Sequence, residues 1–333
     1  MARHEGSAED RLIARYFKPL AKDSRALGLL DDCAVMTPRL GHDVVLTTDA
    51  IVAGVHFLTD DPADTVAKKA LRVNLSDLAA KGAEPSGFLL TLALPPDVSE
   101  DWLESFAHGL GEDANEFECP LLGGDTVRTP GPLIVSITAL GSVPSGTTVT
   151  RMGAKVGDHV LITGSIGDAV LALRLLREPR LAESWSLDAM LRDYLIARYR
   201  VPQPRNAAAQ AVRMHASASM DVSDGLVGDL GKLCAASGVS AEVTVWEVPF
   251  SPAAQHVLKK EPLLGDALLT GGDDYEVLCT VPSEKVEAFR LAVSGAGVPV
   301  SVIGKIVAGD ASPRLVDREG RTLSFLHPSY SHF

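Results

Sequence analysis

The stretch that decides the fold is Val66-Ala-Lys-Lys-Ala-Leu-Arg-Val-Asn-Leu-Ser-Asp-Leu-Ala-Ala-Lys-Gly-Ala-Glu-Pro85. Its apolar spacing predicts a helix that ends at Gly82, because glycine followed shortly by proline is a common helix terminus. At 3.6 residues per turn, Asp77 shares a face with Asn74 and with small or apolar residues. A carboxylate on such a face is costly to bury unless it is paired, hydrogen-bonded or bound to a cation. The stretch therefore predicts a closely packed helix with a functional carboxylate.

Similar carboxylates stand at the ends of other apolar segments, namely Asp31, Asp32, Asp49, Asp125, Asp221, Asp224, Asp273 and Asp274. Hydroxyl groups accompany them in Thr47-Thr48-Asp49 and in Asp221-Val-Ser-Asp224. These are hard oxygen donors, which suit magnesium rather than zinc. We interpret several of these carboxylates as meeting around metal ions.

A Gly-Gly-Asp pattern occurs twice, at 123–125 and 271–273. Two glycines let a backbone approach a ligand closely, and the next carboxylate can then reach a metal or a polar group. Taken alone, either copy is more typical of a turn that ends a strand. Together with Thr47-Thr48-Asp49 and Asp221-Val-Ser-Asp224, however, the two copies favour a metal-binding site over simple turns.

The composition limits the possible functions. A chain of 333 residues with 46% hydrophobic and 22% charged residues is typical of a globular protein of two domains. The net charge of −12 argues against nucleic-acid binding. Four scattered cysteines, no signal-peptide pattern and no membrane-spanning run predict a soluble cytoplasmic protein without a membrane partner.

The order of elements predicts an α+β architecture. In the first half, expected helices at 7–21 and after Ser99 alternate irregularly with strands at 44–57, 87–94, 121–125 and 133–140. This order favours a mixed sheet with helices on one face. A composition break at 143–148 predicts a linker. In the second half we expect a strand at 159–163, a helix that begins at Asp168 and another helix that begins at Leu226.

Several motifs are absent: a phosphate-binding P-loop, a kinase catalytic loop and a Gly-x-Ser-x-Gly nucleophile turn. The residues alone therefore indicate a two-domain magnesium enzyme of phosphate chemistry.

Five motifs carry a resemblance to a known family: Thr48–Phe57, Lys69–Pro85, Leu122–Arg128, Met220–Leu226 and Gly271–Glu276. In this order they resemble the thiamine-monophosphate kinases, a family within the aminoimidazole ribonucleotide synthetase superfamily. The likeness extends from Leu12 to the end of the chain. It implies an ATP-dependent transfer of a phosphoryl group to thiamine monophosphate, giving thiamine diphosphate.

The resemblance also implies an architecture. Residues 1–142 would form an ATP- and magnesium-binding domain that dimerises through a barrel shared by two protomers. Residues 150–333 would form a C-terminal α+β domain that closes the active site. The expected partners are ATP, thiamine monophosphate and a second copy of the chain.

Residue roles follow from the resemblance by position. The shell for several magnesium ions would be Asp32, Thr47, Thr48, Asp49, Asp77, Asp125, Asp221 and Asp224. Residues that meet the ATP phosphates would be Gly124, Asp125, Arg151 and Ser223. Residues that meet thiamine monophosphate would be His56, Asp273 and Tyr330, the last with its ring against the cationic thiazolium.

Two departures from the family pattern stand out. The family usually has Gly-Ile-Gly-Asp-Asp where this chain has Gly28-Leu-Leu-Asp-Asp32, so Leu30 is expected to alter a backbone turn beside Asp32. The family usually has Gly-Gly-Glu-Asp-Tyr-Glu, so Asp273 is one methylene shorter and is expected to reach its partner through water.

The chemistry needs no catalytic base. A phosphate monoester is largely dianionic at neutral pH, so its oxygen can attack the γ-phosphoryl group of ATP directly. Two alternatives remain open: another ATP-dependent enzyme of the superfamily, such as selenophosphate synthetase or the ribonucleotide cyclo-ligase, and a non-catalytic nucleotide- or thiamine-binding regulator.

Overall fold

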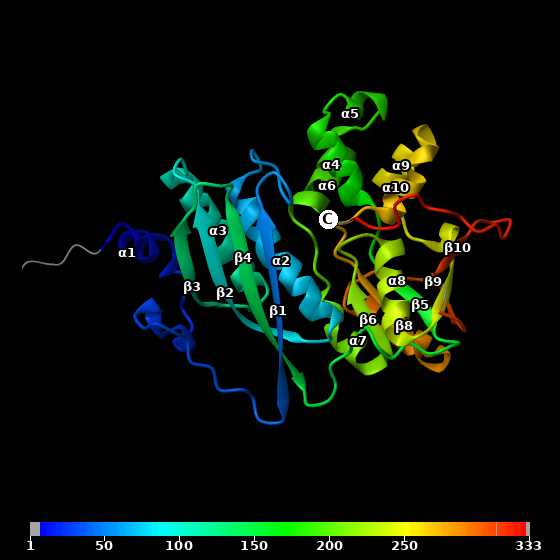
Figure 1. Cartoon of the computed structure of the whole chain (residues 1–333), viewed down its shortest axis with the longest axis horizontal. Helices are drawn as coiled ribbons and strands as arrows, with labels where there is room; N and C mark the ends of the chain where they lie inside the picture. Colours follow the sequence, from blue (N-terminus) through cyan, green and yellow to red (C-terminus); the bar gives the residue numbers. More distant parts are fainter. Residues whose placement is uncertain (1–6, 311, 331–333) are drawn as a thin grey trace, which may run out of the picture. The chain divides into compact units, whose positions relative to one another are not determined.

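The structure is a computed structural model that describes residues 7–310 and 312–330. Contacts divide the chain into two compact units (Figure 1). The first comprises Met1–Leu78 and Glu84–Gly146, and the second comprises Ala79–Ala83 and Thr147–Phe333. Each unit has its own sheet.

The first unit contains, in chain order, α1 (Ala8–Leu12), the π-helical turn η1 (Ile13–Phe17), the 3₁₀ segment η2 (Ser24–Leu29), β1 (His42–Val52), α2 (Ala63–Ala80), β2 (Glu84–Leu94), α3 (Glu100–Glu116), β3 (Leu121–Arg128) and β4 (Ile134–Pro144). Ser7 caps α1 with its side chain, and Ser99 caps α3. Both caps are the kind that the sequence predicts, since serine oxygens satisfy the first backbone N–H groups of a helix.

The four strands form an open sheet in the order β1-β4-β2-β3, with only β2 and β3 parallel. Along β4, Val135, Ile137 and Ala139 are fully buried, and the residues between them are partly exposed. This period of two means that one face is packed and the other is open. Helices α2 and α3 lie against the packed face (Figure 1).

The second unit contains, in chain order, β5 (His159–Thr163), α4 (Asp168–Arg177), α5 (Leu181–Ser184), α6 (Ala189–Arg200), η3 (Asn206–Ala208), α7 (Ala209–His215), β6 (Ala218–Asp221), α8 (Leu226–Ser237), β7 (Ser240–Thr244), η4 (Val245–Glu247), α9 (Pro252–Lys260), η5 (Pro262–Leu264), α10 (Gly265–Thr270), β8 (Val277–Val281), η6 (Ser283–Lys285), α11 (Val286–Gly295), β9 (Val300–Val307) and β10 (Arg314–Val316). Its six strands follow the order β10-β7-β9-β5-β8-β6.

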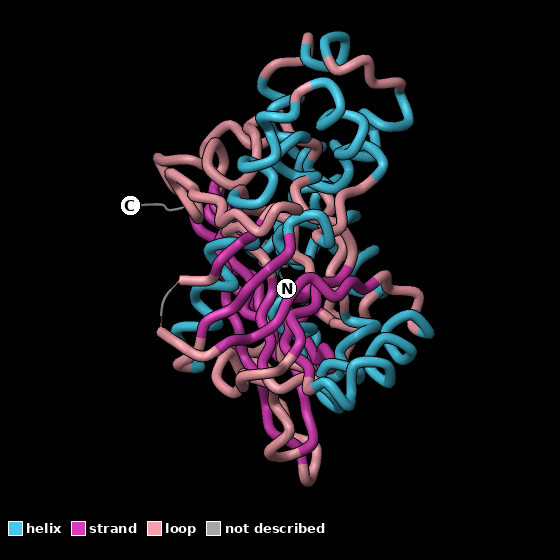
Figure 2. Tube along the Cα trace, turned by 90° about the vertical axis from the view of Figure 1, so that its right-hand side faces the viewer, coloured by secondary structure: helices cyan, strands magenta, loops and turns pink. Residues whose placement is uncertain are grey.

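Helices cover both faces of this second sheet. On β5, Val160 and Ile162 pack in a cluster with α8, whereas Leu161 between them packs with residues of α7 and α11. Strands buried on both faces are apolar throughout, and β5 and β8 show this pattern. Helices α4, α6 and α9 form a further cluster around Trp185 and Tyr199, and Figure 2 shows helices gathered at one end of the trace.

The predicted architecture of mixed sheets with helices is confirmed, and the helix expected from Val66 to Gly82 is α2. Three boundaries differ. The segment 7–21 forms a short α-helix followed by η1 instead of one helix. The strand expected to continue to Phe57 ends at Val52, because a turn containing Gly54 at φ +80° reverses the chain. The predicted linker begins inside β4, which runs to Pro144.

The described residues include no helix that is both long and apolar enough to cross a membrane.

Candidate functional site

Helix α2 directs polar side chains at β1. Thr47 donates a hydrogen bond of 2.5 Å to Oδ2 of Asp77. Strand β1 is an edge strand, so the backbone N–H of Asp49 has no strand partner on its outer side. Asn74, which is fully buried, accepts that N–H at 3.1 Å. The structure thus brings Thr47 and the backbone of Asp49 against the face of α2 that carries Asn74 and Asp77. The buried side-chain amide of Asn74 satisfies a backbone N–H at the edge of the sheet.

His56 lies in the turn after β1. Its Nδ1 accepts the backbone N–H of Val52 at 3.1 Å, so Nδ1 has a lone pair and the ring proton of the neutral form is on Nε2. Lys69 of α2, only 2% exposed, donates to the carbonyl oxygen of His56 at 2.8 Å. The turn therefore holds the imidazole in one tautomer and is tied to α2.

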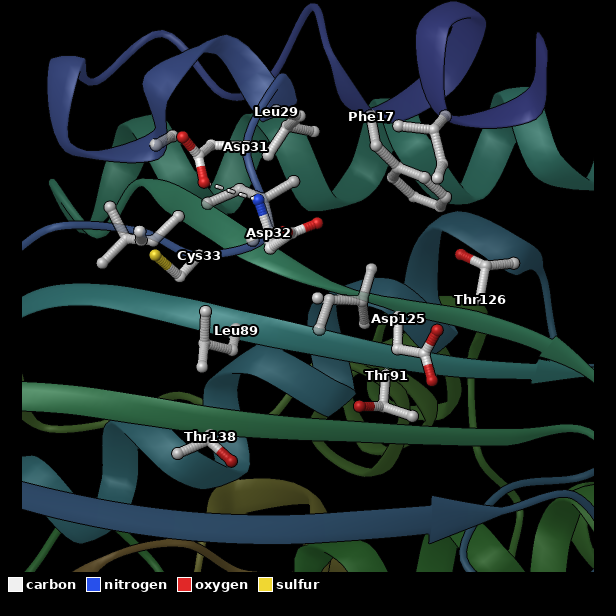
Figure 3. A pocket seen from close by; sticks show the side chains of 18 of the residues that line it. Phe17, Leu29, Asp31, Asp32, Cys33, Leu89, Thr91, Asp125, Thr126 and Thr138 are labelled. Atoms are coloured by element: carbon white, nitrogen blue, oxygen red, sulfur yellow. Dashed lines mark hydrogen bonds between the residues drawn. The ribbon is translucent and has the colours of Figure 1, made fainter. Parts of the chain in front are cut away.

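A pocket of about 610 Å³ opens on the other face of the first sheet. Figure 3 shows Asp32 and Cys33 on the N-terminal segment, across the pocket from Asp125 and Thr91 on adjacent strands. Thr91 and Asp125 are paired residues of β2 and β3, and paired residues point to the same face. The structure thus gathers Asp32, Gly124 and Asp125, three of the predicted residues, around one pocket.

Gly124 is explained by packing within the sheet. A Cβ at this position would lie 1.8 Å from the carbonyl oxygen of Leu90 on β2. In the second copy of the pattern, a Cβ on Gly272 would lie 2.2 Å from the carbonyl oxygen of Ser223. The second glycine of each Gly-Gly-Asp pattern therefore lets two backbone segments approach each other, which is a structural reason that the sequence pattern alone did not reveal.

Leu30 does not occupy the strained part of the N-terminal turn. Its φ is −110°, whereas positive φ values fall on Leu27, Gly28 and Leu29. A side chain is therefore accommodated at position 30 in an ordinary conformation, and Leu30 is 79% exposed. Asp32, next along, is exposed, and its N–H is bound by the side chain of Asp31.

Thr48 points away from Thr47 and Asp49, as alternation along a strand requires. Its hydroxyl donates to the carbonyl oxygen of Ile137 and accepts from Thr138, which also lines the pocket. The predicted metal residues of the first unit thus divide between the two faces of the sheet.

Backbone hydrogen bonds bring the predicted residues of the second unit together. The N–H of Asp273 donates to the carbonyl oxygen of Ser223 at 2.9 Å, and the N–H of Tyr330 donates to that of Asp224 at 3.0 Å. Asp221 is buried at the end of β6. Ser223, Asp224, Asp273 and Tyr330 therefore form one group around the start of α8. Arg151 is exposed, and its carbonyl oxygen accepts a hydrogen bond from Ser237.

Asp224 has a charged partner. Lys232, two turns along α8, places Nζ 2.5 Å from Oδ2 of Asp224 and 2.7 Å from Oδ1 of Asp229. Asp229 is fully buried, and its Oδ2 accepts the backbone N–H groups of Ser223 and Asp224. Burial raises the pKa of Asp229, and the hydrogen bond from Lys232 acts in the opposite direction. Sequence reasoning missed Lys232 and Asp229, although their spacing of three places both on one helix face.

The loop 271–276 rests on two buried acids. Both oxygens of Asp274 accept the N–H of Gly167 at 2.9 Å, and burial raises the pKa of Asp274 well above its usual range. Glu276 is bound by Arg198 at 2.9 Å, by Arg205 at 2.5 Å and by the hydroxyl of Thr163 at 2.7 Å. These contacts of Asp274 and Glu276 hold the loop against the buried interior of the second unit.

Asp273 and Tyr275 occupy the left-handed region, with φ of +71° and +52°. Non-glycine residues in this conformation cost free energy and are concentrated at functional sites. The hydroxyl of Tyr275 donates to Oδ1 of Asp273 at 3.1 Å. The loop therefore holds Asp273 in a strained conformation with a tyrosine on one oxygen.

The donor set fits magnesium. Among the described residues no group of three or more His, Cys, Asp and Glu side chains is arranged to hold a metal ion. Asp77 instead has the hydroxyl of Thr47 as its neighbour, and Asp49 lies on the same face of β1 as Thr47. Magnesium is commonly held by one or two carboxylates together with waters and substrate phosphates, so oxygen donors of this kind suit it.

Two family descriptions match the chain, one to each half. Residues 30–143 match "AIR synthase related protein, N-terminal domain", and residues 155–315 match "AIR synthase related protein, C-terminal domain". Fold and site thus define a protein of the AIR synthase related class.

Curated relatives narrow the class. The thiamine-monophosphate kinase of Caulobacter vibrioides is 48% identical over 302 residues, which cover 90% of this chain and 84% of that protein. The thiamine-monophosphate kinase of Escherichia coli K12 is 43% identical over 329 residues, which cover 98% of each chain. The chain belongs to the thiamine-monophosphate kinase family.

Solved structures of thiamine-monophosphate kinases share this fold. The thiamine-monophosphate kinase from Stenotrophomonas maltophilia K279a aligns with a TM-score of 0.82 and 36% identity, over 96% of this chain and 98% of that chain. AaThiL, solved in complex with AMPPCP and TMP, aligns with a TM-score of 0.77 and 29% identity, over 91% of each chain.

Proposed function

We propose that this chain is an ATP-dependent kinase that phosphorylates thiamine monophosphate to thiamine diphosphate. The observation that carries the proposal is identity to thiamine-monophosphate kinases over nearly the whole chain, together with a structural relative solved with AMPPCP and TMP. The acceptor phosphate is its own nucleophile, because a phosphate monoester is largely dianionic at neutral pH. The protein then has to align two anions and offset their repulsion.

Magnesium ions bound to the carboxylates would offset this repulsion and stabilise the charge that develops on the transferred phosphoryl group. In the first unit we assign this role to Asp32, Thr47, Thr48, Asp49, Asp77 and Asp125, and in the second to Asp221 and Asp224. Asn74 and Thr47 keep Asp49 and Asp77 in place. Gly124 and Asp125 line the pocket proposed to receive the nucleotide, and Arg151 and Ser223 would contact its phosphates.

Three residues would bind thiamine monophosphate. The tautomer of His56 presents an Nε2–H, which can donate to a phosphate oxygen. Asp273 is held by the hydroxyl of Tyr275, and its negative charge favours the cationic thiazolium. The ring of Tyr330 is half exposed and can stack on the same cation.

The open face of the first sheet supports a homodimer. Leu46 is 64% exposed on β1, Leu89 is 39% exposed on β2, and Val127 is 43% exposed on β3. All three point away from α2 and α3, and exposed apolar side chains on an open sheet face favour an interface. We assign dimerisation and ATP binding to residues 1–142, and the closing of the active site to residues 150–333. We further propose that the enzyme is cytoplasmic, with its cysteines reduced.

Product analysis tests the function. The protein is incubated with ATP, magnesium and thiamine monophosphate, and nucleotides and thiamine phosphates are separated. Equal amounts of ADP and thiamine diphosphate are expected. Intact ATP under all magnesium conditions would favour the non-catalytic regulator, and ATP hydrolysis without thiamine diphosphate would favour another enzyme of the superfamily.

Cys33 provides a direct reporter of nucleotide binding. It is exposed and lines the pocket, whereas Cys119, Cys234 and Cys279 are buried. Burial raises the pKa of Cys119 to about 12 and that of Cys234 to about 11, which suppresses their reaction with alkylating agents. Magnesium with a non-hydrolysable ATP analogue should slow alkylation of Cys33, and an unchanged rate would contradict nucleotide binding in this pocket.

A further inference from the structure

The ion pair between Asp224 and Lys232 lies within the proposed metal shell. The ammonium is 2.5 Å from Oδ2 of Asp224, a carboxylate that is assigned to magnesium. A magnesium ion would lie about 2.1 Å from a ligating oxygen. An ammonium and a divalent cation on the same oxygen would repel each other strongly, because both are positive and only a few ångströms apart.

Lys232 has a second anchor. Oδ2 of the buried Asp229 is taken by two backbone N–H groups, and its Oδ1 accepts Lys232 at 2.7 Å. The Lys232 side chain is 41% exposed, so it has room to move. The ammonium can therefore leave Asp224 and remain paired with Asp229, which avoids leaving a buried carboxylate uncompensated.

We propose that Lys232 competes with the divalent cation for Asp224, so that Asp224 becomes a metal ligand only when Lys232 withdraws to Asp229. This proposal rests on the proposed function, since it takes Asp224 as a metal ligand. Its consequence is that metal alone binds weakly at Asp224. A nucleotide that brings phosphate oxygens with the metal provides the additional ligands that make displacement of the ammonium favourable.

Binding of Mn²⁺, a spectroscopic substitute that prefers the same oxygen ligands, tests the proposal on the full chain. Lys232→Met should tighten Mn²⁺ binding by about fivefold, the ratio that corresponds to an exposed ion pair of ~1 kcal/mol. Lys232→Arg keeps the charge and should match the wild type, as should Lys259→Met, which removes one exposed lysine of α9. The gain should vanish when Asp224→Asn is added. Unchanged or weaker Mn²⁺ binding in Lys232→Met would overturn the proposal.

A second measurement needs no variant of Lys232. Acetylation of individual lysines in the wild-type chain is followed by mass spectrometry, without metal and with Mg²⁺ plus a non-hydrolysable ATP analogue. Labelling of Lys232 should increase when the metal complex binds, because the ammonium then has one carboxylate partner instead of two. Lys259 serves as the internal reference. An unchanged ratio of the two rates would overturn the proposal even if Lys232→Met fails to fold.

The role of Lys232 and the kinase activity can be tested separately. Formation of thiamine diphosphate with unchanged Mn²⁺ affinity and unchanged labelling would leave the proposed function intact and remove only the role of Lys232. Absence of product with no metal effect at Asp224 in any variant would remove both.

Discussion

Glu276 is a buried charge with three donors, so its neutralisation gives a prediction whose size follows from the structure. The side chain is fully buried and bound by Arg198, Arg205 and Thr163. Glu276→Gln keeps the shape but removes the charge. The side chain of Arg205 is 18% exposed and can turn toward water, whereas that of Arg198 is 8% exposed and keeps the carbonyl oxygen of Asp274 and, at 3.9 Å, the carboxylate of Asp168.

Breaking one side of a buried ion pair costs about 3–5 kcal/mol. Because Arg205 can regain water, we expect the lower end of this range, about 3 kcal/mol of unfolding free energy. With a urea m-value of about 2 kcal/mol/M, the midpoint should fall by about 1.5 M. Trp102→Phe leaves Trp185 and Trp246, both in the second unit, as the fluorescence reporters of that unit.

The matched control is Glu287→Gln, since Glu287 is 84% exposed and pairs with Arg290. It should change the unfolding free energy by less than about 0.5 kcal/mol. Adding Arg198→Met to Glu276→Gln should restore part of the loss, because an apolar residue of similar volume needs no counter-charge. A loss below about 1 kcal/mol for Glu276→Gln would refute the reasoning.

The remaining predictions concern the site and its supports. Asp49→Asn or Asp77→Asn should reduce turnover at least about a hundredfold by loss of metal-held charge, worth several kcal/mol, and near-normal turnover of both at saturating magnesium would contradict the metal assignment. Lys69→Met removes a charged hydrogen bond of about 1.5 kcal/mol to the His56 turn, so KM for thiamine monophosphate should rise about tenfold with little change in kcat, and a fall in kcat alone would argue against a positioning role. Burial raises the pKa of Asp274, so the folded state holds more protons than the unfolded state between the ordinary and the raised pKa, and wild-type stability falls as pH rises through that window. Asp274→Asn lacks this proton, so its urea stability relative to the wild type should increase from pH 5 to pH 8, and parallel pH profiles would exclude the effect.

Local patterns in the sequence were sufficient for the elements that carry the site. The stripe of α2 and its glycine stop depend on neighbours within a few turns, and so does the cap at Ser99. The position of Asp77 on a buried face was also readable, because helical spacing alone fixes it. Its partner Thr47 was named for a different reason, as a hydroxyl next to a carboxylate.

Contacts between distant parts of the chain were not readable. Thr91 and Asp125 are neighbours because β2 and β3 pair in parallel with a register shift, and no local signal fixes a register across α3. Glu276 lies more than seventy residues from Arg198 and Arg205 along the chain. The sequence therefore did not indicate that these two arginines pair with Glu276. The role of the two Gly-Gly-Asp patterns could not be decided from the sequence, because a glycine required by a neighbouring backbone and one required by a ligand are identical in sequence.

These features have one consequence for how the carboxylates work. Asp77 accepts Thr47, Asp224 accepts Lys232, and Asp273 accepts Tyr275, so each is already engaged by a donor of the chain. A donor that occupies a carboxylate keeps it oriented without metal, and it also lowers the gain when a cation binds. The described residues include no group of three His, Cys, Asp or Glu side chains that could hold a metal ion, so under the proposed function phosphate oxygens of the nucleotide would add ligands to magnesium. Metal and nucleotide must then strengthen each other's binding by the same factor, because a coupling free energy between two ligands is reciprocal. For a kinase this linkage means that a full set of positive charges assembles only when the phosphates that need it are present.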